Sequence, residues 1–215
     1  MTAVRGRTLD RIAGRLVGRP VPHPLRVAVD AVTAAGKSTF AADLATAVAA
    51  CGRVAIHLST DDYHHVAAVR HRNPDRARGY YEDAYDLAAF RRLVLDPLGP
   101  GGERRYRARR HNLATDEVLD EPPETAPADA IVVVDGSFLQ SPALAGAWDE
   151  VIWLDVPMAT ALERAIPRDT AQFGGADAVR AAYENRYHPA CALYLAAVDP
   201  RANATIVVPD ADLAY

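Results

Sequence analysis

The sequence has 215 residues, of which 50% are hydrophobic and 24% are charged, and its formal net charge is −4. This length and composition suit one globular α/β domain and leave little room for two. The acidic balance gives no field that would attract nucleic acid or an anionic membrane, so we expect neither as a partner. No apolar run is long enough to cross a membrane. Cys51 and Cys191 lie far apart and outside any cluster with metal-ligand spacing, so we expect free thiols and a cytoplasmic protein.

Residues 1–20 predict a short amphipathic helix, because their apolar residues recur at helical spacing. The residues of this stripe are Leu9, Ile12, Ala13 and Leu16. Prolines at positions 20, 22 and 24 then separate the helix from the segment that follows.

Five apolar and mostly β-branched runs predict strands that are covered on both faces. They are residues 25–29, 54–59, 130–135, 151–156 and 204–208. Helical patterns separate these runs, and the segment 121–129 is predicted to be a surface loop. Alternating strands and helices predict βαβ units with a parallel sheet, in a single domain over 1–215.

A phosphate-binding pattern follows the first expected strand directly and leads into a helix. The segment DAVTAAGKSTF matches the P-loop pattern at Gly36, Lys37 and Ser38, while Ala31 occupies the place of its first glycine. Ala31 is compatible with a P-loop if its φ is negative, since only left-handed backbone demands glycine. Backbone N–H groups at such a helix start bind phosphate oxygens, the lysine contacts the β- and γ-phosphates, and the serine ligates magnesium. The predicted ATP phosphate-binding residues here are Thr33, Ala34, Ala35, Gly36, Lys37, Ser38 and Thr39.

Two further strand ends carry carboxylates. The run IVVVDG ends in Asp135, the layout of a Walker B residue that holds magnesium beside the P-loop. The second expected strand ends in Asp61 and Asp62. Ligands of a doubly wound sheet gather at the carboxyl ends of its strands, and a kinase of an alcohol needs a carboxylate there to accept the hydroxyl proton. Neighbouring side chains of an extended strand point in opposite directions, so we expect only one of this pair to face the metal.

These segments follow one another in a known order. From about Leu25 to Asp210 the chain resembles the uridine kinase and phosphoribulokinase family. The segments that carry this resemblance are DAVTAAGKST, STDDYHH, YYEDAYD, RRYRARRH, IVVVDG, VIWLDVP, ERAIPRD and ATIVVPD. The resemblance implies a P-loop NTPase fold with a five-stranded parallel sheet, helices on both faces and a short Arg-bearing lid at about 164–176. It also implies ATP and Mg²⁺ as the phosphoryl donor.

The resemblance assigns roles to individual residues. It implies that Asp61, Lys37 and Arg168 are catalytic and that Asp61 helps to hold the metal with Ser38 and Asp135. It also implies that Arg168 and its neighbour Arg164 reach the phosphates. The acceptor-binding positions that it implies are Asp62, Tyr63, His64, Tyr80, Tyr106 and His111.

The sequence departs from the family at the sugar end of the acceptor site. Tyr80 occupies the position of a carboxylate that grips the ribose, and residues 171–175 lack the arginines of the usual lid. The resemblance favours a kinase of a nucleoside such as uridine, cytidine or a modified nucleoside. A kinase of a non-nucleoside or already phosphorylated acceptor remains open, as do a P-loop ATPase or switch and a homo-oligomer. The arginines of residues 104–110 are interpreted as a solvated loop or as an anchor for a phosphorylated acceptor.

Overall fold

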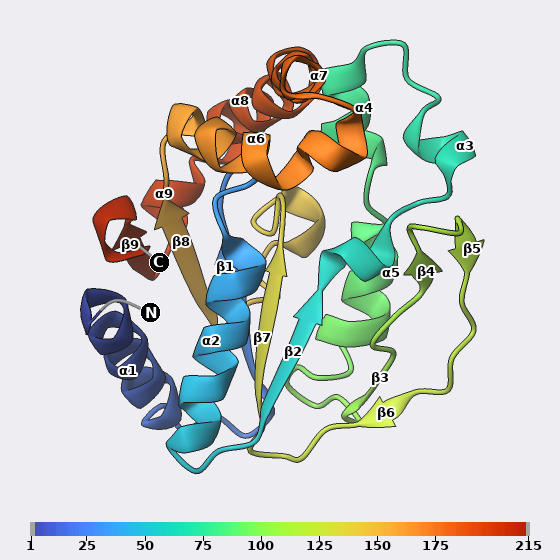
Figure 1. The fold of residues 1–215 in the computed structure, drawn as a ribbon. Coiled ribbons are helices and arrows are strands. Elements are labelled where there is room, and N and C mark those ends of the chain that lie inside the picture. The colour runs from blue at the N-terminus through green and yellow to red at the C-terminus, as the bar shows by residue number, and fades with distance from the viewer. Residues whose placement is uncertain (1–2, 214–215) are drawn as a thin grey trace.

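The computed structural model describes residues 3–213. Its centre is a sheet of five parallel strands in the order β2-β7-β1-β8-β9 (Figure 1). The strands are β1 (Leu25–Asp30), β2 (Ala55–Ser59), β7 (Ile131–Gly136), β8 (Glu150–Asp155) and β9 (Ile206–Pro209). Each begins within two residues of its expected range, so the prediction of a five-stranded parallel sheet is confirmed.

The two faces of the sheet are covered by different helices, because side chains alternate along each strand. Val27 and Val29 belong to one apolar cluster, together with α1 (Ala3–Val17) and α2 (Lys37–Ala50). Ala28, between them, belongs to a second cluster. That cluster includes the segment made by α5 (Leu87–Phe90) and η2 (Arg91–Leu95). The sheet is therefore buried on both sides, which explains its continuous apolar runs.

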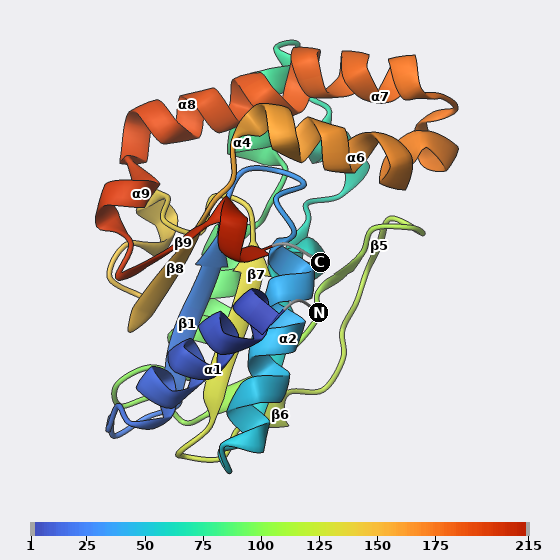
Figure 2. The same cartoon turned by 60° about the vertical axis from the view of Figure 1, so that its left-hand side comes forward.

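A layer of helices lies across the carboxyl ends of the strands (Figures 1 and 2). It contains α4, α6, α7 and α8, and η4 joins the last two. Their bounds are α4 (Arg76–Asp83), α6 (Met158–Phe173), α7 (Ala176–Ala182), η4 (Tyr183–Tyr187) and α8 (His188–Val198). The segment expected to form a lid, about 164–176, is the second half of α6 and the turn into α7. Gly174 ends α6 there at a φ of 81°.

Shorter elements complete the chain. They are α3 (Ala67–Arg70), α9 (Pro200–Asn203), η1 (Thr60–Tyr63), η3 (Pro142–Leu144), η5 (Asp210–Leu213), β3 (Arg105–Tyr106), β4 (His111–Asn112), β5 (Glu117–Val118) and β6 (Glu124–Thr125). The strands β3 and β6, and likewise β4 and β5, form two small antiparallel ladders, so the loop expected over 121–129 contains a strand. Within residues 3–213, every helix is too short or too polar to cross a bilayer.

The N-terminal helix packs against α2 with its predicted stripe. Leu9, Ile12, Ala13 and Leu16 are all 2% exposed or less, so the amphipathic helix expected there is confirmed. Burying such side chains contributes roughly 1.5–3 kcal/mol for each large one.

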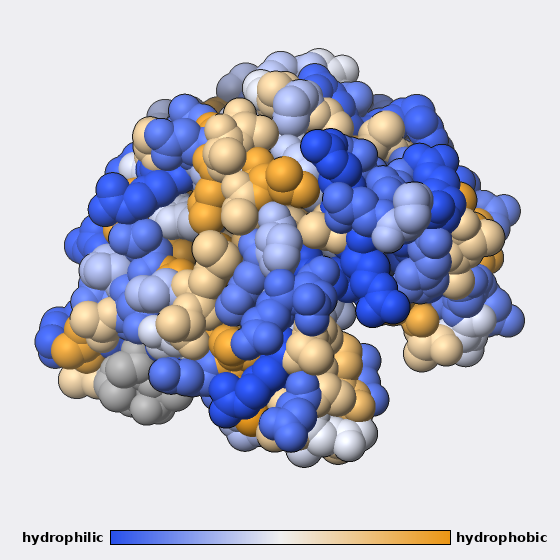
Figure 3. Space-filling view, turned by 90° about the horizontal axis from the view of Figure 1, so that it is seen from above, coloured by the Kyte–Doolittle hydropathy of each residue, from blue (hydrophilic) through white to orange (hydrophobic). Residues whose placement is uncertain are grey.

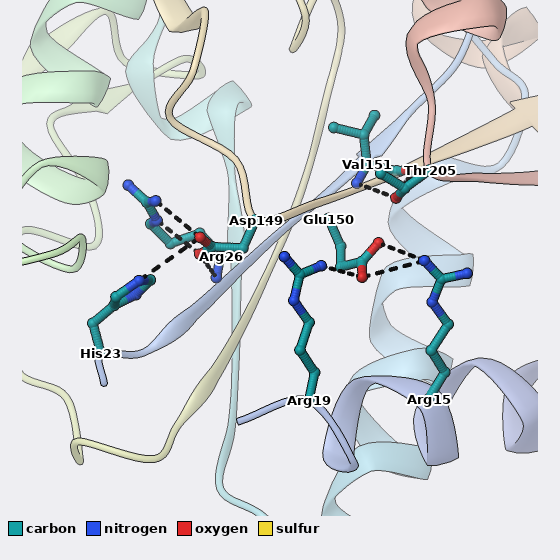
Figure 4. A network of polar contacts seen from close by, with 8 residues as sticks. All are labelled: Arg15, Arg19, His23, Arg26, Asp149, Glu150, Val151 and Thr205. Carbon is teal, nitrogen blue, oxygen red and sulfur yellow. Dashed lines mark hydrogen bonds and ion pairs between the residues drawn. The ribbon is translucent and has the colours of Figure 1, made fainter. Parts of the chain in front are cut away.

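Ion pairs attach the same helix to the amino-terminal edge of the sheet (Figure 4). Glu150 at the start of β8 is 2% exposed and accepts hydrogen bonds from Arg15 and Arg19. Beside it, Arg26 donates from its backbone N–H and its side chain to Asp149. Burial alone would raise the pKa of Glu150, but hydrogen bonds from Thr205 and Arg19 and the charges of both arginines outweigh it and hold that pKa below its ordinary value.

We predict that Glu150→Gln lowers the free energy of unfolding at pH 7 by about 1–3 kcal/mol, because two arginines lose their charged partner. The pKa of Glu150 is depressed in the folded state, so its contribution is present above the unfolded-state pKa and is lost as the pH falls below about 4.5. Urea denaturation at pH 7 and at pH 3 measures both effects. A difference between variant and parent that is the same at both pH values would contradict this account.

Candidate functional site

The P-loop joins β1 to α2 at the carboxyl end of the sheet. Gly36 precedes α2 with a φ of 91°, which a side chain would strain, and Ala34 holds a φ of 65° in the same loop. Ala31 is absent from the positive-φ residues of the described chain, so it fits the place of the first glycine as expected. The backbone N–H groups at this helix start are left for an anion.

Lys37 is the only lysine in the sequence and is 9% exposed. Its Nζ donates to the carbonyl oxygens of Val32, at 3.0 Å, and Ala31, at 3.4 Å. The side chain therefore folds back along its own loop, and its charge lies within the loop that would surround a phosphate.

Asp135, at the end of β7, gathers partners from two neighbouring elements. Its carboxylate is 2% exposed, and Oδ2 accepts a hydrogen bond of 2.5 Å from Ser38 Oγ. Its Oδ1 lies 2.7 Å from Nε2 of His57, on β2. No motif of the sequence points to His57. Its pairing partner in the sheet is Val133, two residues before Asp135, a relation that only the strand register reveals.

The residues around Ser38 fit a magnesium ion that is also held by phosphate. Within residues 3–213 no group of three His, Cys, Asp or Glu side chains forms a complete metal cage. Mg²⁺ in nucleotide sites takes one or two carboxylates together with phosphate oxygens and water. Ser38 Oγ and the carboxylate of Asp135 supply oxygen donors of this kind, side by side beneath the P-loop.

Asp61 and Asp62 lie in a 3-10 turn, η1, where an extended strand end was expected. Ser59 causes the turn, because its hydroxyl accepts a hydrogen bond from the backbone N–H of Asp61 at 3.2 Å. The two side chains still separate. Asp61 lines a cavity with the P-loop, whereas Asp62 pairs with Arg109 at 3.1 Å outside the three cavities described below. Burial raises the pKa of Asp62, and Arg109 offsets part of that effect.

A cavity of about 170 Å³ brings the expected catalytic groups together. Its lining includes Lys37, Ser38, Asp61, Asp135 and Arg168, together with other P-loop residues. Of the expected phosphate-binding residues, Thr33, Ala34, Gly36 and Thr39 also line it, while Ala35 is buried beneath. Cationic, hydroxyl and carboxylate groups from four parts of the chain thus face one space.

A second cavity, of about 460 Å³, opens beside the first and shares Asp61, Tyr80 and Arg168 with it. His64 and Tyr85 also line it. The Tyr85 hydroxyl donates to Asp61 Oδ1 at 3.4 Å and lies 3.2 Å from the Tyr80 hydroxyl. Figure 3 looks onto this end of the molecule, where hydrophilic and hydrophobic residues are interspersed around a notch. This larger space is the candidate acceptor site.

Several expected site residues lie outside these cavities, because each of them is hydrogen-bonded to another group of the protein. Tyr106 is 3% exposed and donates to Glu124 at 2.9 Å, and His111 is 2% exposed with its Nε2 3.1 Å from Asp116. Tyr63 is buried and donates to the Arg107 carbonyl. On α6, Arg164 donates to Asp210 at 2.6 Å and lines none of the cavities, whereas Arg168 lines the cavity beside the P-loop.

Asp30 supports the P-loop from behind. It is fully buried at the end of β1, and its Oδ2 accepts hydrogen bonds from Tyr194 on α8 and from Gln140. Burial raises the pKa of Asp30 to about 6, although these bonds and the charge of Lys37 act in the opposite direction. Both partners come from segments distant in the chain, so no local sequence pattern indicates them.

Comparisons with known proteins are informative at the level of structure. No family model matches the sequence, and no curated protein matches it significantly. The structure is similar to a possible uridine kinase from Bacillus stearothermophilus, with a TM-score of 0.75 and 19% identity over 96% of this chain and 99% of that one. It is also similar to a candidate fructose transport system kinase from Silicibacter sp., with a TM-score of 0.76 and 23% identity over 97% of this chain and 100% of that one.

A third similar structure is D-glycerate 3-kinase from Cryptococcus neoformans, with a TM-score of 0.63 and 13% identity over 89% of this chain and 88% of that one. Identities this low show the fold alone. The chain has the P-loop kinase fold, and its resemblance to the uridine kinase and phosphoribulokinase family is confirmed at that level.

We predict that Gly136→Ala disrupts the contact between β7 and η1. A Cβ at this position would lie 2.0 Å from Thr60 Oγ1, and Thr60 is fully buried, so the turn that carries Asp61 must shift. The expected loss is about 1–3 kcal/mol in the free energy of unfolding, and Thr60→Ala in the same background should restore part of it. Gly14→Ala is the control, because a Cβ there meets nothing within 4 Å and adds about 0.5–1 kcal/mol in a helix. Equal stability of Gly136→Ala and the unmodified protein would contradict the steric argument.

Proposed function

We propose that this chain is a kinase that transfers the γ-phosphoryl group of ATP to a hydroxyl of a small molecule. The observation that supports this most is the cavity shared by Lys37, Ser38, Asp135, Asp61 and Arg168. A P-loop that only bound nucleotide would have no need of an additional carboxylate facing the phosphates from the end of β2. That carboxylate, with a larger cavity on its far side, is what phosphoryl transfer to an alcohol requires.

Each residue has a defined task in this proposal. The P-loop N–H groups and Lys37 bind the β- and γ-phosphates, and Arg168 adds positive charge from α6. Ser38 and Asp135 hold Mg²⁺, which offsets phosphate charge when bound. Asp61 accepts the proton of the acceptor hydroxyl while the hydroxyl oxygen forms a bond to the γ-phosphorus. The bond between the γ-phosphorus and the oxygen that bridges it to the β-phosphate breaks, and ADP leaves. Tyr85 orients the Asp61 carboxylate through its hydrogen bond to Oδ1.

The acceptor is proposed to be a small hydroxyl compound that need not contain a nucleobase. The nucleoside hypothesis depends on Tyr106 and His111, which the family resemblance assigns to the base. In this fold the two side chains contact Glu124 and Asp116 and line none of the described cavities. Uridine and cytidine therefore belong in any acceptor panel beside sugars and sugar acids.

We predict that Lys37→Ala lowers acceptor-dependent ADP release by about two orders of magnitude or more, because the charge on the transferring phosphate is lost. Lys37→Arg is the matched control, since it keeps the charge but not the compact ammonium, and should retain more activity than the alanine variant. Coupled ADP-release assays with the acceptor panel measure both variants. Near-normal turnover by a folded Lys37→Ala protein would refute the kinase proposal.

We predict that Asp61→Asn is far more damaging than Asp62→Asn in single-turnover phosphoryl transfer, by roughly 10²-fold or more. Asp61 faces the phosphate cavity, whereas Asp62 pairs with Arg109 away from it. The two substitutions are chemically identical and adjacent, so each controls for the other. The assignment is wrong if Asp62→Asn is inactive while Asp61→Asn is mild.

A further inference from the structure

A third cavity, of about 700 Å³, lies between the α3–α4 segment and the α7–η4 segment. Its lining carries three arginines and one histidine but no aspartate or glutamate. The charged and titratable residues of this lining are Arg70, His71, Arg76 and Arg186. In a protein with an overall formal charge of −4, a cavity with only cationic groups in its wall is a local reversal of charge.

This cationic cavity adjoins the acceptor cavity. The two share Arg70, His71, Phe173, Arg186 and Tyr187 in their walls. A single small molecule can therefore present a hydroxyl to Asp61 and extend another group toward the shared arginines. The acceptor cavity alone has a volume of about 460 Å³, within the usual range for a small-molecule site.

Arg186 is the cation best placed to bind such a group. Its guanidinium carbon lies 5.2 Å from the ring centre of Tyr80 and 5.3 Å from that of Tyr187. Cation–π contacts with two rings restrain the guanidinium without using its N–H groups as hydrogen-bond donors. Within residues 3–213 no carboxylate lies within ion-pair distance of Arg186, and the same holds for Arg76.

The other cations nearby differ in their partners. Arg168 already forms a two-point ion pair with Asp169, at 2.6 and 2.9 Å. Arg70 donates to Asp116 through one terminal nitrogen, while its buried Nε has no hydrogen-bond partner. Arg70 is therefore only partly neutralised, and its charge contributes to the positive wall of the cavity.

Tyr80 turns this cationic character toward the acceptor. The family resemblance assigns its position to a carboxylate that binds ribose hydroxyls. Burial raises the pKa of Tyr80 to about 12, so the side chain is neutral at physiological pH. A neutral ring in contact with a guanidinium thus stands where the family has a carboxylate, so residue 80 adds no negative charge beside Arg186.

The basic run at 104–110 does not supply this charge. Arg107 pairs with Asp120, Arg109 with Asp62, and none of the run lines the described cavities. The structure therefore does not support the hypothesis that arginines 104–110 bind the phosphate of an acceptor in these cavities.

We propose that the acceptor itself is anionic, with a phosphate or carboxylate that binds Arg186 and is assisted by Arg70 and Arg76, while its hydroxyl faces Asp61. This inference rests on the proposed kinase function and names the acceptor class of the same site. Carboxylate and phosphate both form bidentate contacts with a guanidinium, so Arg186 suits either group. The experiment below distinguishes the two.

The test uses matched acceptors that differ only in one group. Glycerol, glycerate and glycerol 3-phosphate form one set, and ribose, ribonate and ribose 5-phosphate form another, with uridine as a neutral nucleoside. ADP release gives kcat and KM for each, and calorimetry gives direct binding. We expect an anionic member to have a KM at least tenfold below that of its neutral parent, and the preferred group identifies phosphate or carboxylate.

Variants of the cationic wall give the decisive comparison. Arg186→Gln should raise the KM for the anionic acceptor about tenfold or more without changing the KM for ATP, and exposed Arg76→Gln should have a smaller effect of the same kind. Arg180→Gln on α7 is the control, because Arg180 lines none of the three cavities. Thermal unfolding verifies that each variant is folded.

The outcomes separate this inference from the function on which it rests. The inference is overturned if uridine or a neutral parent is turned over as well as the anionic acceptors are. It is also overturned if Arg186→Gln affects neutral and anionic acceptors equally. Either result leaves the kinase proposal intact. If no acceptor supports ADP release, the kinase proposal fails, and calorimetry decides the inference. The inference is supported if the protein binds glycerol 3-phosphate, glycerate, ribose 5-phosphate or ribonate and Arg186→Gln weakens that binding. It is overturned if none of these compounds binds.

Discussion

The buried carboxylate of Asp135 links the elements that the site requires. A charge that is 2% exposed is stable only when its oxygens are hydrogen-bonded, and Ser38 and His57 meet this need from α2 and β2. The helix that follows the P-loop and the edge strand β2 are thereby held against the end of β7. One residue later, the missing side chain of Gly136 allows Thr60 to approach, which sets the start of the turn that carries Asp61. The relation between the phosphate end and the acceptor end of the site follows from these contacts.

The two ends of the site differ in how they are built. The phosphate end uses backbone groups and short side chains at adjacent strand ends, an arrangement that the fold itself provides. The acceptor end uses side chains from the helical layer above the sheet, such as Tyr80 from α4 and Arg186 from η4. Substitutions in that layer leave the sheet unchanged, so acceptor preference can change while the phosphate chemistry stays the same. The solved structures that share this fold bear the names of kinases with different acceptors, in line with this division.

The phosphate end of the site is predicted from two local patterns, the strand–loop–helix order around Lys37 and the apolar strand that ends in Asp135, and the structure brings both residues to one cavity. The sequence predicts less of the acceptor end. The irregular segment between residues 104 and 125 has no periodicity to indicate its path, so the burial of Tyr106 against Glu124 could not be foreseen. Likewise, the turn at Asp61 depends on a hydrogen bond from its own backbone to Ser59, which strand propensity does not reveal. No sequence pattern indicates Arg186, because its contact with Tyr80 joins residues more than a hundred positions apart.

Transfer of the γ-phosphoryl group to an organic hydroxyl is the central claim, and isotope tracing tests it most directly. The protein would be incubated with ATP carrying a radioactive γ-phosphate, together with Mg²⁺ and the acceptor panel, and the products separated by charge. The account predicts one labelled organic phosphate for each ADP formed, and no such product without an acceptor. Label that appears only as inorganic phosphate, at a rate independent of every acceptor, would contradict the account and identify the protein as an ATPase.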